Sequence, residues 1–468
     1  MNVTTILKYS IGPFGAAFLG MLSLPLLTWI IPQKDIGIFS LYNLFVGFSL
    51  IICSLGLDQS YIRDYHSSSD RSKLLINCFI PGTVVLMVFF ILVSCLYKFL
   101  FPVEIDFGML LVIFVGVTST YFYRYITLFL RLDNKPVSYS ISQLIPKLFF
   151  IMLVIALYYS LNTSLEFKDL IILSAASLLL SLVYFFHKTI HYWKGSKVDA
   201  LSKIEFIKLA KYGLPLAFSG LVYWALTAVD RFFIAKLASL EELALYSVAM
   251  SISSAAMILK TLFQTLWAPT VYNWVHQKRD LSKVDSINSI ISFLVIVGFC
   301  IMGLLSEFVN YFIPSNYHSV YVLAIACVGF PLFLTLAEAT GIGINVTKRT
   351  YLNFYSAFIS LLLNILMNYL LIPTYGAKGA AASTLVSFWL YFIFKTFYSR
   401  IYWRKFPVFK IYLFSTLCMT LSLLSLFYMQ VENELLKLIW LMFLILSLYC
   451  YRKTIQTLYQ FILYKKVL

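Results

Sequence analysis

The chain consists of long, nearly uninterrupted runs of apolar residues separated by short polar segments. A run of about 20 apolar residues is long enough to cross the hydrocarbon core of a bilayer as an α-helix. In lipid, backbone groups must be hydrogen-bonded internally, so repeated runs of that length favour a helical bundle. Of the 468 residues, 61% are hydrophobic and 12% are charged, whereas soluble proteins average about 45–50% and about 25%. The sequence therefore predicts an all-α integral membrane protein.

The apolar runs predict about fourteen transmembrane helices in three groups. We expect an N-terminal six-helix lobe in residues 1–190 and a C-terminal six-helix lobe in residues 211–400. A cytoplasmic basic linker, residues 191–210, joins them, and helices 13 and 14 with a cytoplasmic tail occupy residues 401–468. The predicted spans are residues 9–31, 36–57, 74–97, 107–130, 137–160, 168–187, 211–234, 243–268, 286–312, 319–345, 351–372, 376–398, 407–429 and 435–451.

Two stretches in the two lobes share a pattern. KYSIGP at residues 8–13 corresponds to KYGLP at residues 211–215, and KDIGIFS at residues 34–40 corresponds to EELALYS at residues 241–247. Chance similarity between apolar sequences is the alternative. Because both copies run in the same direction, the repeat predicts two lobes related by a pseudo-two-fold axis along the membrane normal.

The distribution of basic residues predicts the orientation in the membrane. With a cytoplasmic N-terminus, roughly 26 Lys and Arg residues fall inside, about 6 outside and about 4 within spans. Both termini are therefore expected in the cytoplasm. The net charge of +16 comes mostly from this bias, so the expected partner is the lipid bilayer and no nucleic acid.

The sequence lacks the motifs of several enzyme classes. It contains no Walker A motif, no Gly-rich nucleotide loop, no HExxH and no GxSxG. The seven cysteines and five histidines form no cluster, so neither a metal nor a cofactor is expected. No long outside loop is available for a catalytic site. We therefore expect a protein that is not an enzyme, with a membrane polysaccharide polymerase or glycosyl ligase as an alternative.

Several ionisable residues lie within the predicted spans. A charge at the bilayer centre costs about 2.5–3.5 kcal/mol, so each must face a cavity, a partner or an interface. Buried cations surrounded by polar aromatic residues suit an anionic phosphate attached to a sugar. The candidate substrate-binding residues are Arg124, Lys147, Lys260, Arg231, Tyr223 and Trp224, and the candidate ion-coupling residues are Glu338 and Asp230.

Structural roles are open alternatives for these charges. Lys260 could pair with Glu338 or Asp230, and Arg124 could extend to the lipid headgroups. Asp230 and Arg231 are adjacent, so they point about 100° apart on a helix and could form a local ion pair. Glu338 could carry a proton or form a structural pair. From the sequence alone, a structural role and a functional role are both open for each of these residues.

Several segments follow one another in a characteristic order and spacing. They are YGLP at residues 212–215, Asp230-Arg231, YSVA at residues 246–249, WAP at residues 267–269, NILMNYLLIP at residues 364–373 and YGAKGAA at residues 375–381. In this order and spacing they resemble the polysaccharide-transporter branch, which includes the Wzx-type flippases, of the multidrug/oligosaccharidyl-lipid/polysaccharide exporter superfamily. The matches cluster in residues 205–400, while the helix count agrees over the whole chain.

The resemblance implies two six-helix lobes around a central cavity. It also implies a flippase in the inner (cytoplasmic) membrane of a bacterium. The substrate would be an undecaprenyl-pyrophosphate-linked oligosaccharide, a precursor of lipopolysaccharide O-antigen or capsule. It would move to the periplasmic leaflet by alternating access, driven by an ion gradient. By position, the cations facing the pyrophosphate would be Arg124, Lys147, Lys260 and Arg231.

The resemblance also extends to partners and to one further alternative. The polysaccharide polymerase and the chain-length regulator of the same pathway are candidate partners. A small-molecule or drug antiporter of the same superfamily is the nearest alternative function. Such antiporters have twelve spans and fewer cavity cations, whereas this sequence predicts about fourteen spans and four buried cations.

Overall fold

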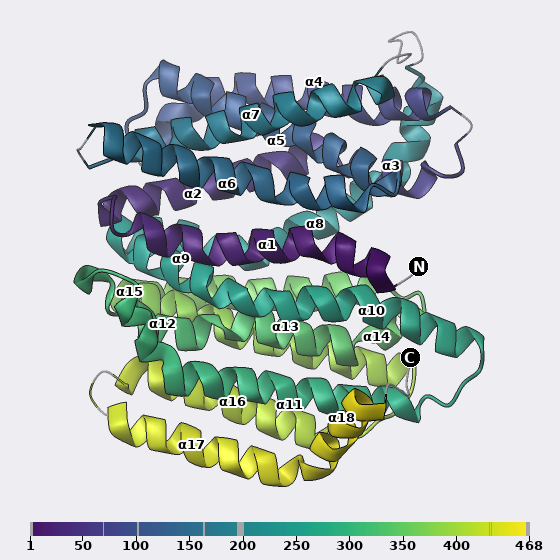
Figure 1. Ribbon diagram of the computed structural model, residues 1–468, viewed down its shortest axis with the longest axis vertical. Helices are drawn as coiled ribbons and strands as arrows, with labels where there is room; N and C mark the ends of the chain where they lie inside the picture. The colour runs from purple at the N-terminus through teal and green to yellow at the C-terminus, as the bar shows by residue number, and fades with distance from the viewer. Residues whose placement is uncertain are drawn as a thin grey trace. The chain divides into compact units, whose positions relative to one another are not determined.

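The computed structural model describes residues 3–464 apart from residues 69, 101–102, 162–163, 194–200, 430 and 432. This part of the chain is helical, without a β-strand (Figure 1). It divides into two compact units. Unit 1 comprises Met1–Ser23 and Ile30–Ala225, and unit 2 comprises Leu24–Trp29 and Leu226–Leu468. The predicted linker, residues 191–210, lies partly outside the described residues.

Twelve helices of the described chain are long and apolar enough to cross a membrane. One of them, Tyr351–Tyr402, has 52 residues, about twice the length that a bilayer requires. It bends at Gly376, so it forms two arms. A shorter apolar helix covers Ile11–Leu27. With the two arms counted separately and this helix added, the fourteen predicted spans are all found. The chain therefore has the all-helical architecture of a multi-pass membrane protein.

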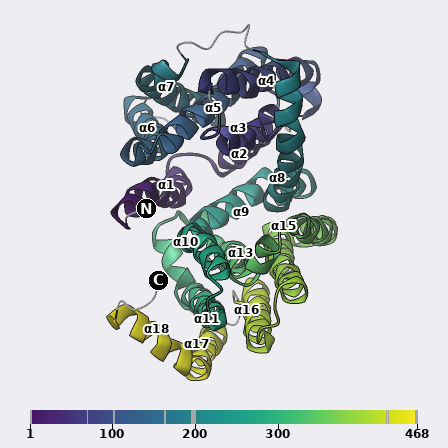
Figure 2. The same cartoon turned by 90° about the vertical axis from the view of Figure 1, so that its right-hand side faces the viewer.

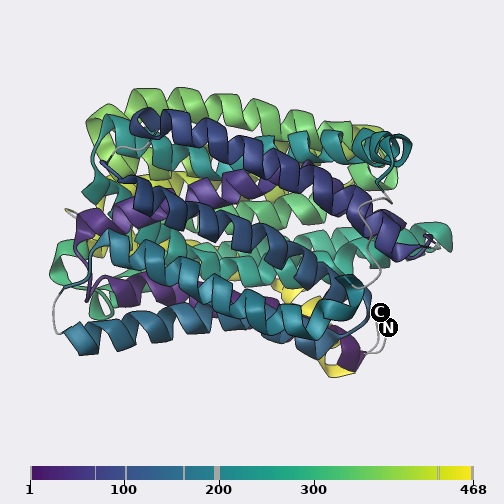
Figure 3. The same cartoon turned by 90° about the horizontal axis from the view of Figure 1, so that it is seen from above.

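Unit 1 contains the first seven helices, apart from the last four residues of the first, and the first part of the eighth. Figure 3 shows its purple and blue helices from above, running in the same general direction. The short helix α3 lies between two predicted spans, a position where the sequence analysis expected a loop. The helices are α1 (Val3–Leu27), α2 (Gln33–Ser54), α3 (Leu57–Asp64), α4 (Arg71–Leu100), α5 (Phe107–Leu132), α6 (Pro136–Leu161), α7 (Phe167–Trp193) and α8 (Lys203–Leu237).

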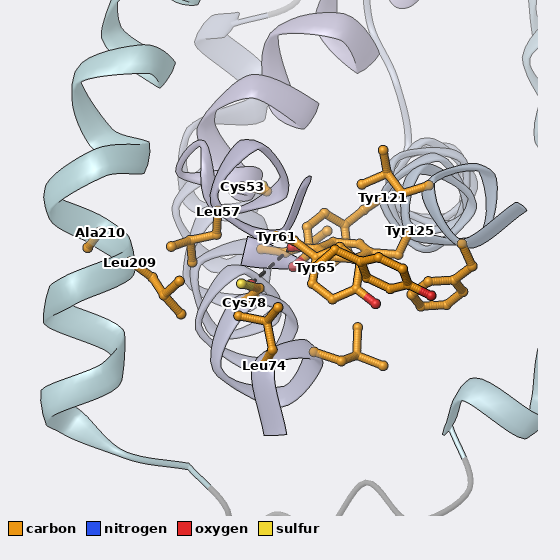
Figure 4. Close-up of a cluster of buried hydrophobic side chains, with 14 of the residues drawn as sticks. Cys53, Leu57, Tyr61, Tyr65, Leu74, Cys78, Tyr121, Tyr125, Leu209 and Ala210 are labelled. Carbon is orange, nitrogen blue, oxygen red and sulfur yellow. Dashed lines mark hydrogen bonds between the residues drawn. The ribbon is translucent and has the colours of Figure 1, made fainter. Parts of the chain in front are cut away.

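A buried aromatic cluster joins α3, α4, α5 and α8 within unit 1 (Figure 4). Pro81 lies inside α4 and cannot donate a backbone hydrogen bond, so the helix is weakened there. Next to it, the Tyr121 hydroxyl donates to the Phe79 carbonyl at 2.7 Å, and the Tyr125 hydroxyl donates to the Cys78 carbonyl at 3.0 Å. These bonds satisfy two buried phenols and hold α5 against the weakened part of α4.

The turn after α5 is tied to its neighbours through Asp133. Its carboxylate accepts hydrogen bonds from the hydroxyls of Tyr65, at 2.6 Å, and Tyr192. Burial opposes ionisation of Asp133, but these two bonds and the charges of Lys135 and Arg71 outweigh it. The pKa of the Asp133 carboxyl is therefore held below its ordinary value. The carboxylate links the end of α5 to α7 and to the segment after α3.

Unit 2 contains the remaining helices. The 3₁₀ turn Ser254–Ala256 connects α9 and α10 into one apolar span. Ser239 caps the first helix, because its hydroxyl accepts a hydrogen bond from the Glu242 backbone N–H at 3.2 Å. The helices are α9 (Leu240–Ser253), α10 (Met257–His276), α11 (Ser282–Leu305), α12 (Val320–Cys327), α13 (Gly329–Thr340), α14 (Ile342–Val346), α15 (Tyr351–Tyr402), α16 (Phe409–Tyr428), α17 (Asn433–Cys450) and α18 (Arg452–Tyr464).

The bend in α15 follows from two residues and is held by a third. Pro373 removes a backbone donor, and Gly376 adopts φ 53° and ψ −129°, which residues with a side chain rarely adopt. The Glu242 carboxylate accepts a hydrogen bond from the Ala377 N–H at 2.8 Å. An acidic group at this position also favours the N-terminal end of the second arm. The bend places both arms of α15 in unit 2.

The close approach of α3 and α8 gives a first prediction. Gly56 has φ +68°, and a Cβ atom added to it would lie 2.1 Å from the Gly213 carbonyl oxygen. Gly56→Ala should therefore lower the stability of the folded protein by about 1–3 kcal/mol. The measurement is the thermal unfolding temperature of purified protein in detergent.

Gly220→Ala is the matched control, because a Cβ atom at Gly220 meets nothing within 4 Å. The control should keep the wild-type unfolding temperature or raise it slightly, since Ala is the better helix former. Equal shifts for the two variants would contradict the contact described here.

Candidate functional site

Lys147 is a half-buried cation inside unit 1. It lies on α6 and donates a hydrogen bond to the Ala16 carbonyl of α1 at 2.5 Å. Gly20 leaves room for it, since a Cβ atom there would lie 2.7 Å from the Lys147 Nζ. No carboxylate of the described residues forms an ion pair with Lys147. Its charge is therefore not neutralised by an acidic side chain in this part of the protein.

Arg124 is paired, unlike Lys147. Its Nε and Nη2 atoms, at 3.1 and 2.8 Å, both donate to one carboxylate oxygen of Asp58 on α3. The Asp58 side chain is 8% exposed, whereas that of Arg124 is 39% exposed. The pair leaves part of the guanidinium accessible. The sequence analysis considered substrate binding and contact with lipid headgroups for Arg124. The geometry adds a third role, because Arg124 neutralises the buried Asp58 carboxylate.

Tyr223 and Trp224 lie on the part of α8 that belongs to unit 1. The Trp224 ring packs against Phe48 of α2, with ring centroids 5.2 Å apart. Its indole nitrogen lies close to Gly47, because a Cβ atom there would be 3.3 Å away. Both Tyr223 and Trp224 are half-buried. Trp224 therefore contributes to packing within unit 1, and a part of its surface is exposed.

Asp230 is the centre of a polar network inside unit 2. It is fully buried on α8 and accepts hydrogen bonds from three neutral side chains. These are Tyr246 of α9 at 2.7 Å, Thr384 at 2.6 Å and Asn368 at 2.8 Å. Asn368 and Thr384 lie on the two arms of α15. Asn368 also donates to the Asn364 carbonyl oxygen at 3.0 Å.

The Asp230 network has no cationic member within ion-pair distance in the described structure. The adjacent Arg231 does not form an ion pair with Asp230, and its buried Nε has no hydrogen-bond partner there. The Nδ2 atom of Asn364 and the Oδ1 atom of Asn368 are also buried without partners. The site is thus a carboxyl group surrounded by hydroxyls and amides, and two of the amide atoms have no hydrogen-bond partner among the described residues.

Glu338 and Lys260 lie in a second charged cluster of unit 2. Glu338, on α13, accepts a hydrogen bond from the Lys395 ammonium of α15 at 3.0 Å. The Lys395 side chain is only 4% exposed, and its ammonium lies 5.4 Å from the centre of the Tyr391 ring. Lys260 of α10 has Glu338 and Lys395 as its electrostatic neighbours. The cluster has two cations for one carboxylate.

The described structure thus brings together Lys260 and Glu338, whereas Asp230 is the centre of another network in which Arg231 donates no hydrogen bond to it. In unit 1, Lys147 and Arg124 have different partners. The sequence analysis missed Asp58, because it follows directly after a predicted span, and Lys395, because it lies near the end of one. Lys395 had one signal: Tyr391 is four residues earlier, so the two share a helix face.

No group of three or more His, Cys, Asp or Glu residues in the described chain could hold a metal ion. The polar groups around Asp230 are instead a single carboxylate, hydroxyls and amides. Such a set suits a proton or a hard monovalent cation rather than a metal held by several acidic side chains.

Solved structures of similar fold include several membrane transporters. The lipid II flippase MurJ, in an inward closed conformation, matches with a TM-score of 0.71 at 16% identity, over 96% of this chain and 100% of that chain. An inward-facing multidrug resistance MATE family transporter of the MOP superfamily matches with a TM-score of 0.56 at 12% identity, covering 87% and 96%. At these identities the likeness shows the fold.

A further match is a MOP superfamily transporter from Pyrococcus furiosus, with a TM-score of 0.50 at 14% identity, over 85% of this chain and 95% of that chain. No curated protein sequence matches this chain significantly. One family model, described as polysaccharide biosynthesis protein, matches residues 4–273. Since this match covers more than half of the chain, the chain belongs to the polysaccharide biosynthesis protein family.

Proposed function

We propose that this chain is a flippase for an undecaprenyl-pyrophosphate-linked oligosaccharide, an O-antigen or capsule precursor, in a bacterial inner membrane. The observation that carries the proposal is the presence of half-buried lysines without ion-pair partners in the described part of a lipid-flippase fold. Keeping a charge inside a membrane is costly, so an unneutralised cation implies an anionic ligand during the working cycle. Pyrophosphate is the group on this substrate that carries the required charge.

Lys147 and Lys260 are the two positions that we assign to the pyrophosphate first. Lys147 donates to a backbone carbonyl and forms no ion pair with a described carboxylate, and Lys260 lies beside a carboxylate that Lys395 already neutralises. Arg124, Arg231, Tyr223 and Trp224 are assigned to the same substrate path, the aromatic rings facing the sugars. The polyprenyl tail would stay in the lipid while the charged group crosses, so the protein lowers the barrier only for the polar part.

We assign ion coupling to Asp230. A carboxylate surrounded by neutral donors can exchange between a protonated, an ion-bound and a hydrogen-bonded state without breaking an ion pair. Glu338, whose charge Lys395 balances at 3.0 Å, is the second candidate. Binding of a proton or a sodium ion at Asp230 would favour one conformation of the transporter, and the ion gradient would thereby drive alternating access.

The experiment that tests the function as a whole asks where the substrate accumulates. In cells that lack this protein, the lipid-linked oligosaccharide should accumulate on the cytoplasmic leaflet, and the wild-type chain should restore its transfer. Accumulation of unpolymerised repeat units on the outer leaflet would contradict the proposal and favour a polymerase. Export of a dye without transfer of the oligosaccharide would favour a drug antiporter.

The lysine assignment gives a second prediction. Lys147→Ala and Lys260→Ala should each reduce flipping of a lipid-linked oligosaccharide in proteoliposomes by about tenfold or more, because each removes a charged hydrogen-bond donor worth about 1.5–3 kcal/mol. Lys236→Ala, at an exposed lysine in the last turn of α8, is the control and should keep wild-type activity. Normal flipping by both variants at normal protein levels would refute the role of these cations.

The coupling assignment gives a third prediction. Asp230→Asn keeps the size of the side chain but removes its charge, so acceleration of flipping by an imposed proton or sodium gradient should be lost. Asp280→Asn, at an exposed carboxylate of the turn after α10, should keep the acceleration. The measurement compares flipping with and without the gradient in one preparation. If flipping by Asp230→Asn still responded fully to the gradient, Asp230 would not be the coupling site. Glu338→Gln would then be the next variant to test.

A further inference from the structure

Helix α18 runs in a different direction from the membrane-spanning helix before it. It begins at Arg452, only two residues after the membrane-crossing helix α17 ends at Cys450. Figure 1 shows α17 lengthwise with α18 turning away at its end, and Figure 2 shows α18 extended sideways from that end. With 13 residues, α18 is about 20 Å long and too short to cross a bilayer.

The corner between α17 and α18 is held at Tyr451. The Tyr451 hydroxyl forms a 2.9 Å hydrogen bond with the Ser292 hydroxyl of α11, and the Tyr451 side chain is fully buried. The Lys410 ammonium lies 3.7 Å from the centre of the Tyr451 ring and donates to the Cys450 carbonyl at the end of α17. Phe414 packs edge-on against the same ring. These contacts set the direction in which α18 starts.

The two sides of α18 differ in chemistry. Ile455 and Leu458 are three residues apart, lie on one face and are half-buried, and the helix packs against α11 and α17. Lys453, Gln456 and Gln460 are exposed on the other side. A helix of this kind, with low overall hydrophobicity and one polar face, is typical of the plane of the membrane interface.

The exposed cations at the start of α18 have no acidic partner in the described structure. Arg452 and Lys453 form no ion pair with a described carboxylate. The Arg452 guanidinium lies 5.3 Å from the Tyr449 ring, and Tyr449 and Tyr459 are 67% and 63% exposed. Exposed tyrosines beside basic residues are characteristic of the boundary between lipid and water. The two exposed cations are therefore not balanced by a described acidic side chain, and they lie where α17 reaches the membrane surface.

We propose that α18 is an interfacial helix that binds anionic phospholipid headgroups at the membrane surface through Arg452 and Lys453. The apolar side anchors the helix to the bundle and the acyl boundary, and the two cations face the phosphates of the lipid leaflet. Anionic lipids are favoured because their charge is opposite to that of Arg452 and Lys453. A zwitterionic surface offers no net attraction to these two cations. The inference concerns the lipid surface and does not depend on the transported substrate.

The test uses the full-length protein in nanodiscs of phosphatidylcholine, with or without phosphatidylglycerol. The readout is amide hydrogen exchange of peptides that cover α18. Phosphatidylglycerol should slow exchange of α18 in the wild type by about thirtyfold, which corresponds to about 2 kcal/mol for two basic residues. Arg452→Gln combined with Lys453→Gln should abolish this slowing. Raised salt should weaken it in the wild type, because the charges are exposed and screened.

Arg279→Gln combined with Lys405→Gln is the matched control. It removes the same charge from two exposed positions outside α18, so the lipid response of α18 should persist. Equal exchange of α18 in both kinds of nanodisc would overturn the proposal, as would a full response in the α18 double variant. If that variant does not fold, the salt series on the wild type decides, and a response unaffected by salt would refute lipid-charge recognition.

Discussion

The structure depends on the cost of placing charge and unpaired backbone groups in lipid. Each helix satisfies its own backbone, but the charged side chains within the spans must find partners from other helices. Asp58 is neutralised by Arg124, Glu338 by Lys395, and Asp230 is held by hydroxyls and an amide. These polar contacts join helices whose remaining surfaces are apolar, and so they help to select which helices become neighbours within each unit.

Small residues and prolines provide the local geometry for these contacts. Gly20 makes room for the Lys147 ammonium, and Gly56 allows the backbone of α3 to approach that of α8. Pro373 and Gly376 bend α15, so that a 52-residue helix becomes two arms within one unit. In each case the sequence departs from a regular apolar helix at a position where a polar side chain or a second backbone comes close.

The spans were predictable because length and hydrophobicity alone define a helix that crosses a bilayer, and all fourteen are found. The short helices α3 and α18 were missed, since neither has the length of a span. The sequence analysis identified several charges within the spans but not Asp58, Lys395 or the pair of Glu307 and Lys437. Their partners were not predictable: helical periodicity shows which face a residue occupies, but packing between distant helices decides whether Arg124 meets Asp58.

The bend of α15 has a consequence for any cation that would bind at Asp230, the coupling site proposed above. Asn368 belongs to the arm before Gly376 and Thr384 to the arm after it, and both donate to the Asp230 carboxylate. The angle between the arms therefore sets the spacing of the groups around that carboxylate. By thermodynamic reciprocity, a cation that draws these groups together would close the angle, and any force that opens the angle would weaken the cation's affinity. A hairpin of two arms can in this way convert the occupancy of one small site into a change of helix direction.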